Sequence, residues 1–330
     1  MPLVLALSAA AANPSVQATK PARGHVEGIA MDGTRVAYDV QGDLPRRCNS
    51  VFVWNVLTGK TTRVSGKGTC DADNTITSGA AVQRLAVAGT RVAWIVEQGG
   101  NTEADDYLYT AKLPRPREHR LAFARRTGSM LDPSFVGGWI GGLVGDRGLV
   151  AVNRWTTNRS GDVVDARLEL AGPRALKLLV PGPASLEARS ADLGRVAVLR
   201  SGGTVAVYSA SGELLQTIVA PAADEVALAG DYLAVLTRKG RLETYSASSG
   251  DHLRTWPVQS SAAHLDLYGR IAVYSTSGGV RVLRLTTGKS AVVARTRGQA
   301  EVQIEAPGLV YAVKSTLYFV PHARVLAALS

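Results

Sequence analysis

Two short acidic runs are the first candidates for a functional site in this chain. They read DADN at 71–74 and EADD at 103–106, so each gathers carboxylates within four residues. Carboxylate and amide oxygens are the ligands that a hard cation such as Ca²⁺ takes. The twelve-residue EF-hand loop is absent, however, and carboxylates in polar segments are usually solvated. The sequence therefore predicts no metal site.

The histidines and serines form no recognisable catalytic set. The histidines show no HExxH spacing, and the two cysteines form no Cys-x-x-Cys pair, which argues against a zinc site. No serine stands in a G-x-S-x-G turn, and no glycine-rich phosphate loop opens a helix, because GGWIGG at 137–142 lies in a strand-rich region. We therefore assign no catalytic residue and expect no cofactor.

Basic residues outnumber acidic ones in this chain of 330 residues, and 37 Lys and Arg against 27 Asp and Glu give a formal net charge of +10. Such a balance can indicate a nucleic acid or an anionic surface as partner. The basic residues are spread along the chain, however, and the run KLPRPREHRLAFARR at 112–126 contains Phe123 as its one aromatic residue. Its arginines also suit an exposed hairpin, so nucleic acid is not expected as a partner.

Any chemistry must be positioned by strands, because one short motif recurs along the whole chain. GTRVAYDV at 33–40 is nearly repeated as GTRVAWIV at 89–96, and relatives follow, among them GRVAVL at 194–199 and GRIAVY at 269–274. Each begins with a turn glycine and continues as an apolar strand. Another strand precedes it, and alternating strands joined by a glycine turn follow, as in VFVWNVLTGK at 51–60. Each unit therefore contains four antiparallel strands.

The repeat predicts an all-β fold, a seven-bladed β-propeller of four-stranded antiparallel blades. Seven such motifs occur between residues 24 and 330, or about 44 residues per unit, which is the usual length of a propeller blade. We therefore expect residues 24–330 to form a single propeller domain, and residues 1–23 to be a signal-peptide remnant or an N-terminal arm. The last blade can take its fourth strand from RVLAALS at 324–330, or the ring can close with a strand from residues 1–23.

At the level of these units the chain resembles the WD40-like repeat proteins, in the broad bacterial sense that includes the TolB-like propellers. VFVWNVLTGK at 51–60 is similar to the third strand and turn of a WD40 blade, although Trp54 is followed by Asn55 rather than aspartate. GRLETYSASSGDHLRTW at 240–256 resembles the PQQ-type repeat, with Trp256 at the position of that repeat's tryptophan. The resemblance implies the propeller fold and leaves the function open, because propellers carry many unrelated functions.

The connections between strands predict which face of the propeller binds a partner. In blades 1 to 3 the connections at one face are long loops, at residues 41–49, 66–80, 97–105, 126–135 and 153–162, whereas those at the opposite face are tight turns. Long loops on a rigid scaffold are where binding usually resides, and mixed charge beside an aromatic residue suits a polar ligand or a protein. The candidate binding residues in these loops are Arg46, Arg47, Asp71, Asp73, Asp105, Asp106, Arg154, Trp155 and Arg159.

The N-terminal segment and the two cysteines indicate a compartment. The apolar run from Leu3 to Ala12 is too short to cross a membrane and resembles the hydrophobic region of a secretory signal. We expect an extracytoplasmic protein, which is periplasmic, associated with the cell wall or secreted, and no transmembrane segment. Cys48 and Cys70 fall at the same edge of the first blade, so flexible loops could bring them within disulfide distance. We predict a disulfide between them.

Two function hypotheses follow. The first is a non-catalytic, exported propeller that binds a protein or a glycan through the long loops of blades 1 to 3. The second is a propeller enzyme, either a hydrolase, a lyase or an oxidoreductase, with a site in the central channel on the same face. An enzyme should bring titratable side chains from several blades together there, whereas a binding module should show an apolar and aromatic patch with a polar rim. The sequence does not indicate the oligomeric state.

Overall fold

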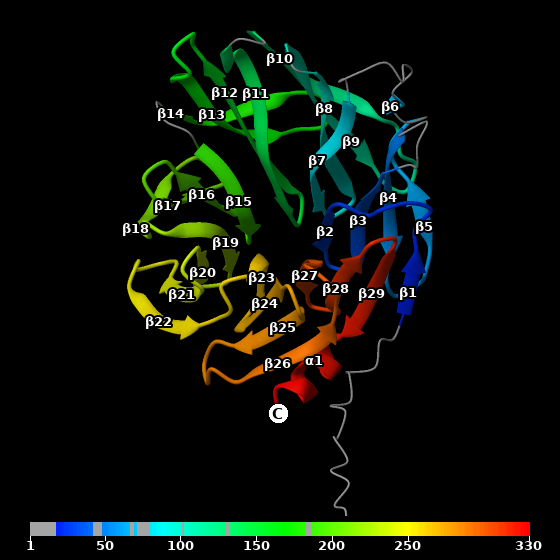
Figure 1. The fold of residues 1–330 in the computed structure, drawn as a ribbon, viewed down its shortest axis with the longest axis vertical. Helices are drawn as coiled ribbons and strands as arrows, with labels where there is room; N and C mark the ends of the chain where they lie inside the picture. Colours follow the sequence, from blue (N-terminus) through cyan, green and yellow to red (C-terminus); the bar gives the residue numbers. More distant parts are fainter. Residues whose placement is uncertain are drawn as a thin grey trace, which may run out of the picture.

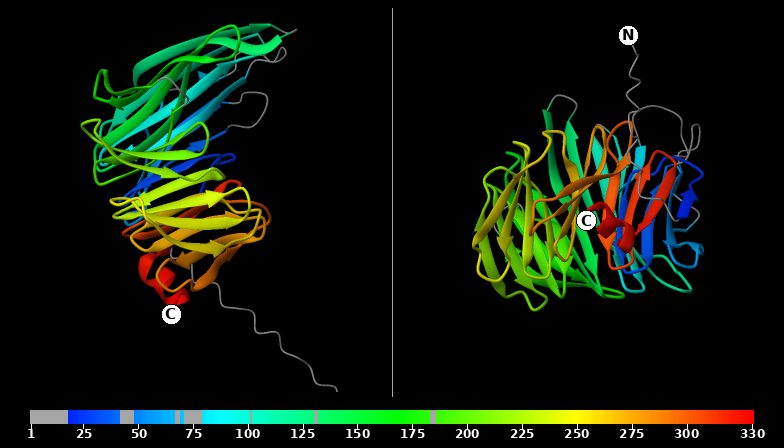
Figure 2. Two further views of the ribbon diagram at one scale, coloured as in Figure 1. Left: turned by 90° about the vertical axis from the view of Figure 1, so that its left-hand side faces the viewer. Right: turned by 90° about the horizontal axis from the view of Figure 1, so that it is seen from below.

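The computed structural model shows β-sheets arranged radially around a central channel (Figure 1). It describes residues 18–41, 48–66, 69–70, 79–100, 102–129, 132–182 and 186–330. Figure 2 shows the same ring from the side and from below, where the sheets stand side by side around it. The fold is therefore an all-β propeller, in which each repeated unit extends outward from an inner strand beside the channel.

Five of the sheets have a path of four neighbouring strands, which are consecutive in the chain except that β1 (Ala18–Pro21) joins the last sheet. The first comprises β2 (Ile29–Asp32), β3 (Arg35–Val40), β4 (Cys48–Asn55) and β5 (Thr61–Arg63), and the short β6 (Thr69–Cys70) also pairs with β4. The second comprises β15 (Leu186–Asp192), β16 (Arg195–Arg200), β17 (Thr204–Ser209) and β18 (Leu214–Val219). The third comprises β19 (Ala223–Ala229), β20 (Tyr232–Thr237), β21 (Arg241–Ser246) and β22 (His252–Pro257). The fourth comprises β23 (Ala263–Tyr268), β24 (Ile271–Thr276), β25 (Gly279–Arg284) and β26 (Ser290–Arg295). The fifth comprises β27 (Glu301–Glu305), β28 (Gly308–Val313), β29 (Thr316–Pro321) and β1.

The sixth sheet has eight strands, and it shows that the prediction of seven separate four-stranded blades is wrong. It comprises β7 (Gly79–Ala88), β8 (Arg91–Gly99), β9 (Glu103–Lys112), β10 (His119–Ser129), β11 (Asp132–Asp146), β12 (Leu149–Thr157), β13 (Val163–Ala171) and β14 (Leu176–Gly182). The cause is the pairing of β10 with β11, in which Arg126 lies opposite Gly137. The sequence assigned residues 126–135 to a loop, but residues 126–129 belong to β10 and residues 132–135 to β11, and the two strands pair.

A glycine makes this join between β10 and β11 sterically feasible. A Cβ atom on Gly137 would lie 2.3 Å from the carbonyl oxygen of Arg125, a separation that real Cβ atoms essentially never show. Any side chain at Gly137 would therefore push the two strands apart. The structure thus contains five four-stranded sheets and one eight-stranded sheet, because a close backbone approach joins two of the repeated units.

β1 closes the ring by pairing with the outer strand β29, from Ala18 opposite Phe319 to Pro21 opposite Thr316. The predicted closure with a strand from residues 1–23 is confirmed, and the alternative of a strand at 324–330 is wrong. Those residues lie largely in α1 (His322–Ala328), which is rich in alanine and leucine and buries Val325 against the last sheets. Within the described ranges, no helix is long and apolar enough to span a membrane. The division of the chain at residue 24 stays a prediction.

The repeated motif forms the second strand of each unit, and the small residue at its centre is buried between neighbouring sheets. Alanine at this position leaves room for the two sheets to approach each other closely. The apolar residues around it bury side chains that each stabilise the fold by about 1.5–3 kcal/mol. The alanines concerned, all with an exposed fraction of 0%, are Ala37, Ala93, Ala151, Ala197, Ala234 and Ala272.

Candidate binding site at the loop end of the channel

The ring has two unlike ends, which we name by their connections. At the turn end, each inner strand is joined to the second strand of its unit by a tight turn, as at Gly33 and Thr34 between β2 and β3. At the loop end lie the connections from second to third strands and those that lead from one unit to the next. Antiparallel pairing places these two sets at opposite ends of every sheet. The inner strands that run beside the channel from the loop end to the turn end are β2, β7, β11, β15, β19, β23 and β27.

Several residues that the sequence assigned to long loops belong to strands instead. β8 extends to Gly99 and β9 begins at Glu103, and β12 likewise extends to Thr157. Successive side chains along a strand point to opposite faces of the sheet. The residues at the loop end are therefore divided between two faces, and only one residue of each adjacent pair can face a given pocket.

Five inner strands contain a shift of register. In β15, for example, Ala188 pairs with Val198 and Ser190 pairs with Ala197, which leaves Arg189 as the extra residue. Such β-bulges redirect side chains and are frequent beside functional sites. The extra residues at the equivalent shifts of β7, β11, β19 and β23 are Gln83, Gly141, Gly142, Asp224, His264 and Leu265.

Side chains of the preceding repeated unit accept hydrogen bonds from backbone N–H groups at these bulges. Asp106 Oδ2 accepts from Ile140 N at 2.9 Å, and Asn153 Oδ1 accepts from Ala188 N at 3.1 Å. Glu225 accepts from the N–H groups of both bulge residues of β23, at 3.0 and 2.8 Å. A buried N–H group without a partner would be costly, so these acceptors stabilise the bulges.

A row of polar and aromatic side chains crosses five consecutive strands of the eight-stranded sheet. We call Glu97, Asp106, Arg126, Trp139 and Trp155 the cross-strand row. The Arg126 side chain is only 3% exposed, and its Nη2 lies 2.6 Å from Glu97 Oε2 and its Nη1 2.7 Å from Asp106 Oδ2. Its guanidinium carbon lies 3.9 Å from the centre of the Trp139 ring, which stacks on Trp155 at 5.7 Å and 4°. Burial raises the pKa of Asp106, although Arg126 acts in the opposite direction.

Beside this row lies a cavity of about 480 Å³, which we call the loop-end pocket. Its wall is contributed by β7, β8, β9, β11 and β12 of the eight-stranded sheet and by β15 and β16 of the next sheet. The pocket is lined by several arginines and two tryptophans. The apolar side chains of Ile140, Leu186 and Leu199 also line it. The arginines and tryptophans are Arg84, Arg189, Arg200, Arg238, Trp139 and Trp155.

The arginines of the loop-end pocket outnumber the carboxylates available to them. Glu187 forms ion pairs with two of them, since its Oε2 lies 2.7 Å from Arg189 Nη2 and its Oε1 lies 3.7 Å from Arg84 Nη2. Arg200 donates from Nη2 to the hydroxyl of Tyr208 and, among the described residues, has no carboxylate partner. Glu97 and Asp106 lie against the buried Arg126, whereas on the opposite side of the pocket Arg189 and Arg200 face Glu187, so that side carries an excess of positive charge.

The channel mouth beside the pocket holds titratable groups from further sheets. His264 Nδ1 on β23 lies 3.2 Å from Glu301 Oε1 on β27. Burial raises the pKa of Glu301, with Glu225 on β19 acting in the same direction and His264 and Arg84 in the opposite one. Groups from β7, β19, β23 and β27 therefore interact electrostatically around the loop end of the channel.

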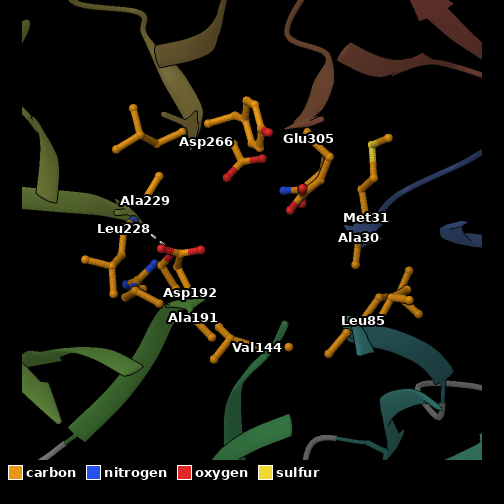
Figure 3. Close-up of a pocket in the computed structure, with 18 of the residues that line it drawn as sticks. Ala30, Met31, Leu85, Val144, Ala191, Asp192, Leu228, Ala229, Asp266 and Glu305 are labelled. Carbon is orange, nitrogen blue, oxygen red and sulfur yellow. Dashed lines mark hydrogen bonds between the residues drawn. The ribbon is translucent and has the colours of Figure 1, made fainter. Parts of the chain in front are cut away.

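The turn end of the channel is acidic. Figure 3 shows Asp192, Asp266 and Glu305 around a cavity of about 150 Å³. Burial and the neighbouring carboxylates raise the pKa of Glu305 to about 8, and burial raises that of Asp266 to about 7.

The carboxylates of the turn end join one inner turn to the next. Oxygens of Asp32, Asp146 and Glu305 lie within 4.8 Å of one another, a spacing that would suit a hard cation. Two of the three are already used, however, since Asp32 accepts from Arg147 N at 3.0 Å and Asp146 from Leu193 N at 2.7 Å. Asp192 similarly accepts from Gly230 N at 2.6 Å. The observed role of these side chains is thus to connect neighbouring sheets.

The structure divides the predicted binding residues among several environments. Asp106 and Trp155 line the loop-end pocket. Their neighbours do not line it, because Asp105 pairs with Arg125 Nε at 2.8 Å, and Arg154 Nη2 donates to Glu169 Oε1 at 2.8 Å. Arg159 is exposed in the turn after β12. The four that lie outside the described residues are Arg46, Arg47, Asp71 and Asp73.

The arginines that shape the loop-end pocket were missed by reasoning from the sequence. A weak signal was present, since Arg200 directly follows the repeated motif GRVAVL, and Arg84 and Arg189 stand in the strands that precede two such motifs. Arg84 and Arg189 lie within two residues of a bulge, and a bulge is not visible in an alternating pattern of apolar and polar residues. Arg126 was missed because residues 126–135 were assigned to a loop.

Comparisons with known proteins show the fold of this chain. No family model and no curated protein matches it. The WD40 β-propeller domain of Doa1 is 15% identical over 94% of this chain and 98% of that chain, with a TM-score of 0.59. A chain of the Mitotic Checkpoint Complex is 14% identical over 97% and 96%, with a TM-score of 0.57. The computationally designed Ika8 protein is 14% identical over 92% and 98%, with a TM-score of 0.53.

Identities this low show the fold and leave the function open. The likeness to the WD40 domain of Doa1 supports the WD40-like resemblance of the repeated units. These comparisons lend no support to the finer resemblance to TolB-like or PQQ-type repeats.

Proposed function

We propose that this protein is a non-catalytic binding module that holds a partner protein at the loop end of the ring. The observation that carries the proposal is the loop-end pocket of about 480 Å³, where arginines from separate strands converge beside two tryptophans. Arginine and tryptophan are enriched among the residues that dominate protein–protein binding energy. The turn end lacks this character, because its carboxylates accept hydrogen bonds from the protein's own backbone.

A glycan is the other partner that the sequence suggested, and the pocket favours a protein over it. A sugar would need an open aromatic face on which to stack. Trp139 offers none, because strand order β10–β11–β12 places Arg126 against one of its faces and Trp155 against the other. The excess of guanidinium groups is better suited to the carboxylates of a protein surface.

The similar structures are compatible with an interaction role. One of them is part of the Mitotic Checkpoint Complex, which is an assembly of proteins. Propellers of the WD40 type commonly serve as scaffolds for protein interactions, and the same use of this fold is what we propose here.

Charge reversal at each end of the ring tests the proposal. Partners are purified on the wild-type protein, on Arg200→Glu at the loop end and on Lys60→Glu at the turn end, and are quantified by mass spectrometry. Both substitutions change the net charge equally, and Lys60 is exposed in the turn between β4 and β5. We expect Arg200→Glu to deplete the partners at least tenfold and Lys60→Glu to leave them unchanged. Equal depletion by both variants, or by neither, would refute a binding site at the loop end.

An enzyme is the second candidate function, and the pair formed by His264 and Glu301 favours it. The pair joins two sheets at the channel mouth, and the raised pKa of Glu301 would suit a general acid. The purified protein can be screened against chromogenic esters, glycosides and phosphate esters. Turnover that His264→Ala abolishes, while the variant keeps its melting temperature, would replace the binding proposal.

We also propose that the protein works outside the cytoplasm, with a signal remnant in the segment that precedes β1 and a disulfide between its cysteines. Cys48 and Cys70 are direct partners where β4 pairs with β6. Antiparallel partners have Cα atoms about 4.5–5.5 Å apart, which is within disulfide range. The structure records no disulfide among the residues it describes, and the side chains of both cysteines lie outside them.

Two measurements test the location. Alkylation of the denatured, unreduced protein should reveal no free thiol, and two free thiols per chain would refute the disulfide. N-terminal sequencing of secreted material should find a start after Ala12, whereas a cytosolic protein that keeps Met1 would contradict export.

A further inference from the structure

Resting on the proposed function, we infer that the loop-end pocket recognises an acidic peptide segment of the partner, with carboxylates on its arginines and an adjoining apolar side chain on its floor. The charges of the pocket give the first argument. Arg189 and Arg200 face one described carboxylate, that of Glu187, which Arg84 shares at 3.7 Å while it also acts on Glu301, and Arg238 at the rim forms an exposed pair with Asp224 at 3.2 Å. A ligand that brings one or two carboxylates would balance this wall.

The arginines are held in place before any ligand arrives. Arg189 occupies the bulge of β15 and is fixed by Glu187, and its side chain is 26% exposed. Arg200 is held by the Tyr208 hydroxyl, and its guanidinium carbon lies 5.6 Å from the centre of the Tyr208 ring. Fixed guanidinium groups lose little side-chain entropy on binding, and each can grip a carboxylate through two parallel hydrogen bonds.

Two donors within this cluster remain unsatisfied. The Nε atoms of Arg189 and Arg200 are buried and have no hydrogen-bond partner. Arg189 on β15 and Arg200 on β16 both line the loop-end pocket, and these two strands are neighbours in one sheet. A carboxylate that draws either guanidinium slightly toward the pocket would offer these donors an acceptor.

The floor of the pocket is apolar. Ile140, Leu186, Leu199 and Trp155 lie among the arginines, and a Cβ atom on Gly141 would be only 2.3 Å from the Trp155 ring. Because Trp155 is packed this tightly, its ring forms a fixed wall. A side chain such as leucine or phenylalanine beside the acidic residue would bury apolar surface there. This combination indicates a peptide, since free inorganic phosphate would leave the apolar floor uncovered.

Selection of peptides on the purified protein tests the inference. A display library of random ten-residue peptides is selected on the wild-type protein, with an Arg84→Gln/Arg200→Gln double variant as counter-selection. We expect enrichment of aspartate or glutamate next to an apolar residue. Enrichment without acidic residues, or no enrichment at all, would overturn the inference.

Titrations with a selected peptide sharpen the result. Its affinity should fall about tenfold or more in Arg200→Gln and stay unchanged in Lys60→Gln, a matched loss of one positive charge at the turn end. Replacement of its acidic residues by asparagine or glutamine should abolish binding, and higher salt should weaken it. If only a version with phosphoserine at these positions binds, a phosphopeptide is the ligand and the acidic segment is refuted.

The outcomes separate this inference from the proposed function. If Arg200→Glu depletes the partner proteins while the selected peptides are not acidic, binding at the loop end stands and the acidic segment fails. Circular dichroism and the melting temperature of each arginine variant exclude unfolding as the cause of a loss.

Discussion

The loop end and the turn end of the ring are built from the same inner strands, yet their chemistry is opposite. At the turn end, carboxylates at the ends of inner strands accept backbone N–H groups of the next sheet, and they raise one another's pKa values. At the loop end, charges of both signs pair, and arginines remain in excess. The difference shows how a repeated unit can close one end of a ring and leave the other open for a ligand.

The bulges of the inner strands account for this difference. Between the bulge and the turn end, each of the five bulged inner strands follows regular pairing, and it then ends in a tight turn. At the bulge, side chains such as Arg189 and His264 leave the regular alternation and face the channel mouth or the loop-end pocket. Binding residues therefore arise at the loop end without long loops, because a local irregularity redirects strand residues.

Among the substitutions that test the difference between the two ends, removal of Arg126 should lower the free energy of unfolding most. Arg126→Leu leaves the carboxylates of Glu97 and Asp106 without their shared cation, and breaking a buried ion pair in this way costs about 3–5 kcal/mol. The neighbouring Arg125 is the matched control, because it points to the other face, is 54% exposed and pairs with Asp105. We expect Arg125→Leu to cost no more than about 1 kcal/mol.

Chemical denaturation of both variants measures these free energies of unfolding. A small and equal effect of the two substitutions would show that the cross-strand row does not hold the loop end together. A large effect of Arg126→Leu with unchanged unfolding of Arg125→Leu would confirm that the row stabilises the eight-stranded sheet.

The sequence predicted the parts of this molecule that depend on regular alternation. The repeated motif identified the second strands, and its alanines are buried between sheets as expected. It did not predict the joined sheet, because the pairing of β10 with β11 depends on a backbone contact at Gly137. Asp105 and Asp106, taken together as loop residues, are separated by the pleat of β9.

A smaller effect is expected where Gly142 occupies the bulge of β11. A Cβ atom there would lie 2.4 Å from the backbone oxygen and 2.7 Å from the backbone nitrogen of Ala188, so β15 would have to move. Gly142→Ala should cost about 2 kcal/mol, as overpacking in a core does. The control Gly33→Ala at the turn end meets nothing within 4 Å, but Gly33 has φ +57°, so we expect about 1 kcal/mol. Thermal unfolding measures both, and a larger loss in Gly33→Ala would contradict the packing described at the loop end.

The smallest expected effect is on the pH dependence of stability, through a carboxylate at the turn end. Burial and the neighbouring carboxylates raise the pKa of Glu305 to about 8 from the ordinary glutamate value of 4.5, so the folded protein binds this proton more tightly than the unfolded chain does. The stability that the proton contributes is complete below about pH 4.5 and is lost as the pH rises through about 8.

Glu305→Gln removes this dependence, because its amide stays neutral throughout. At pH 8.5 the variant should be more stable than the wild-type protein by about 1 kcal/mol, or roughly 2 °C in melting temperature, and at pH 4.5 the two should agree. Glu213→Gln is the control, since Glu213 is exposed in a turn at the same end of the ring and carries the same charge. Equal melting temperatures of Glu305→Gln and the wild-type protein at both pH values would show that the turn end does not hold its carboxylates under mutual repulsion.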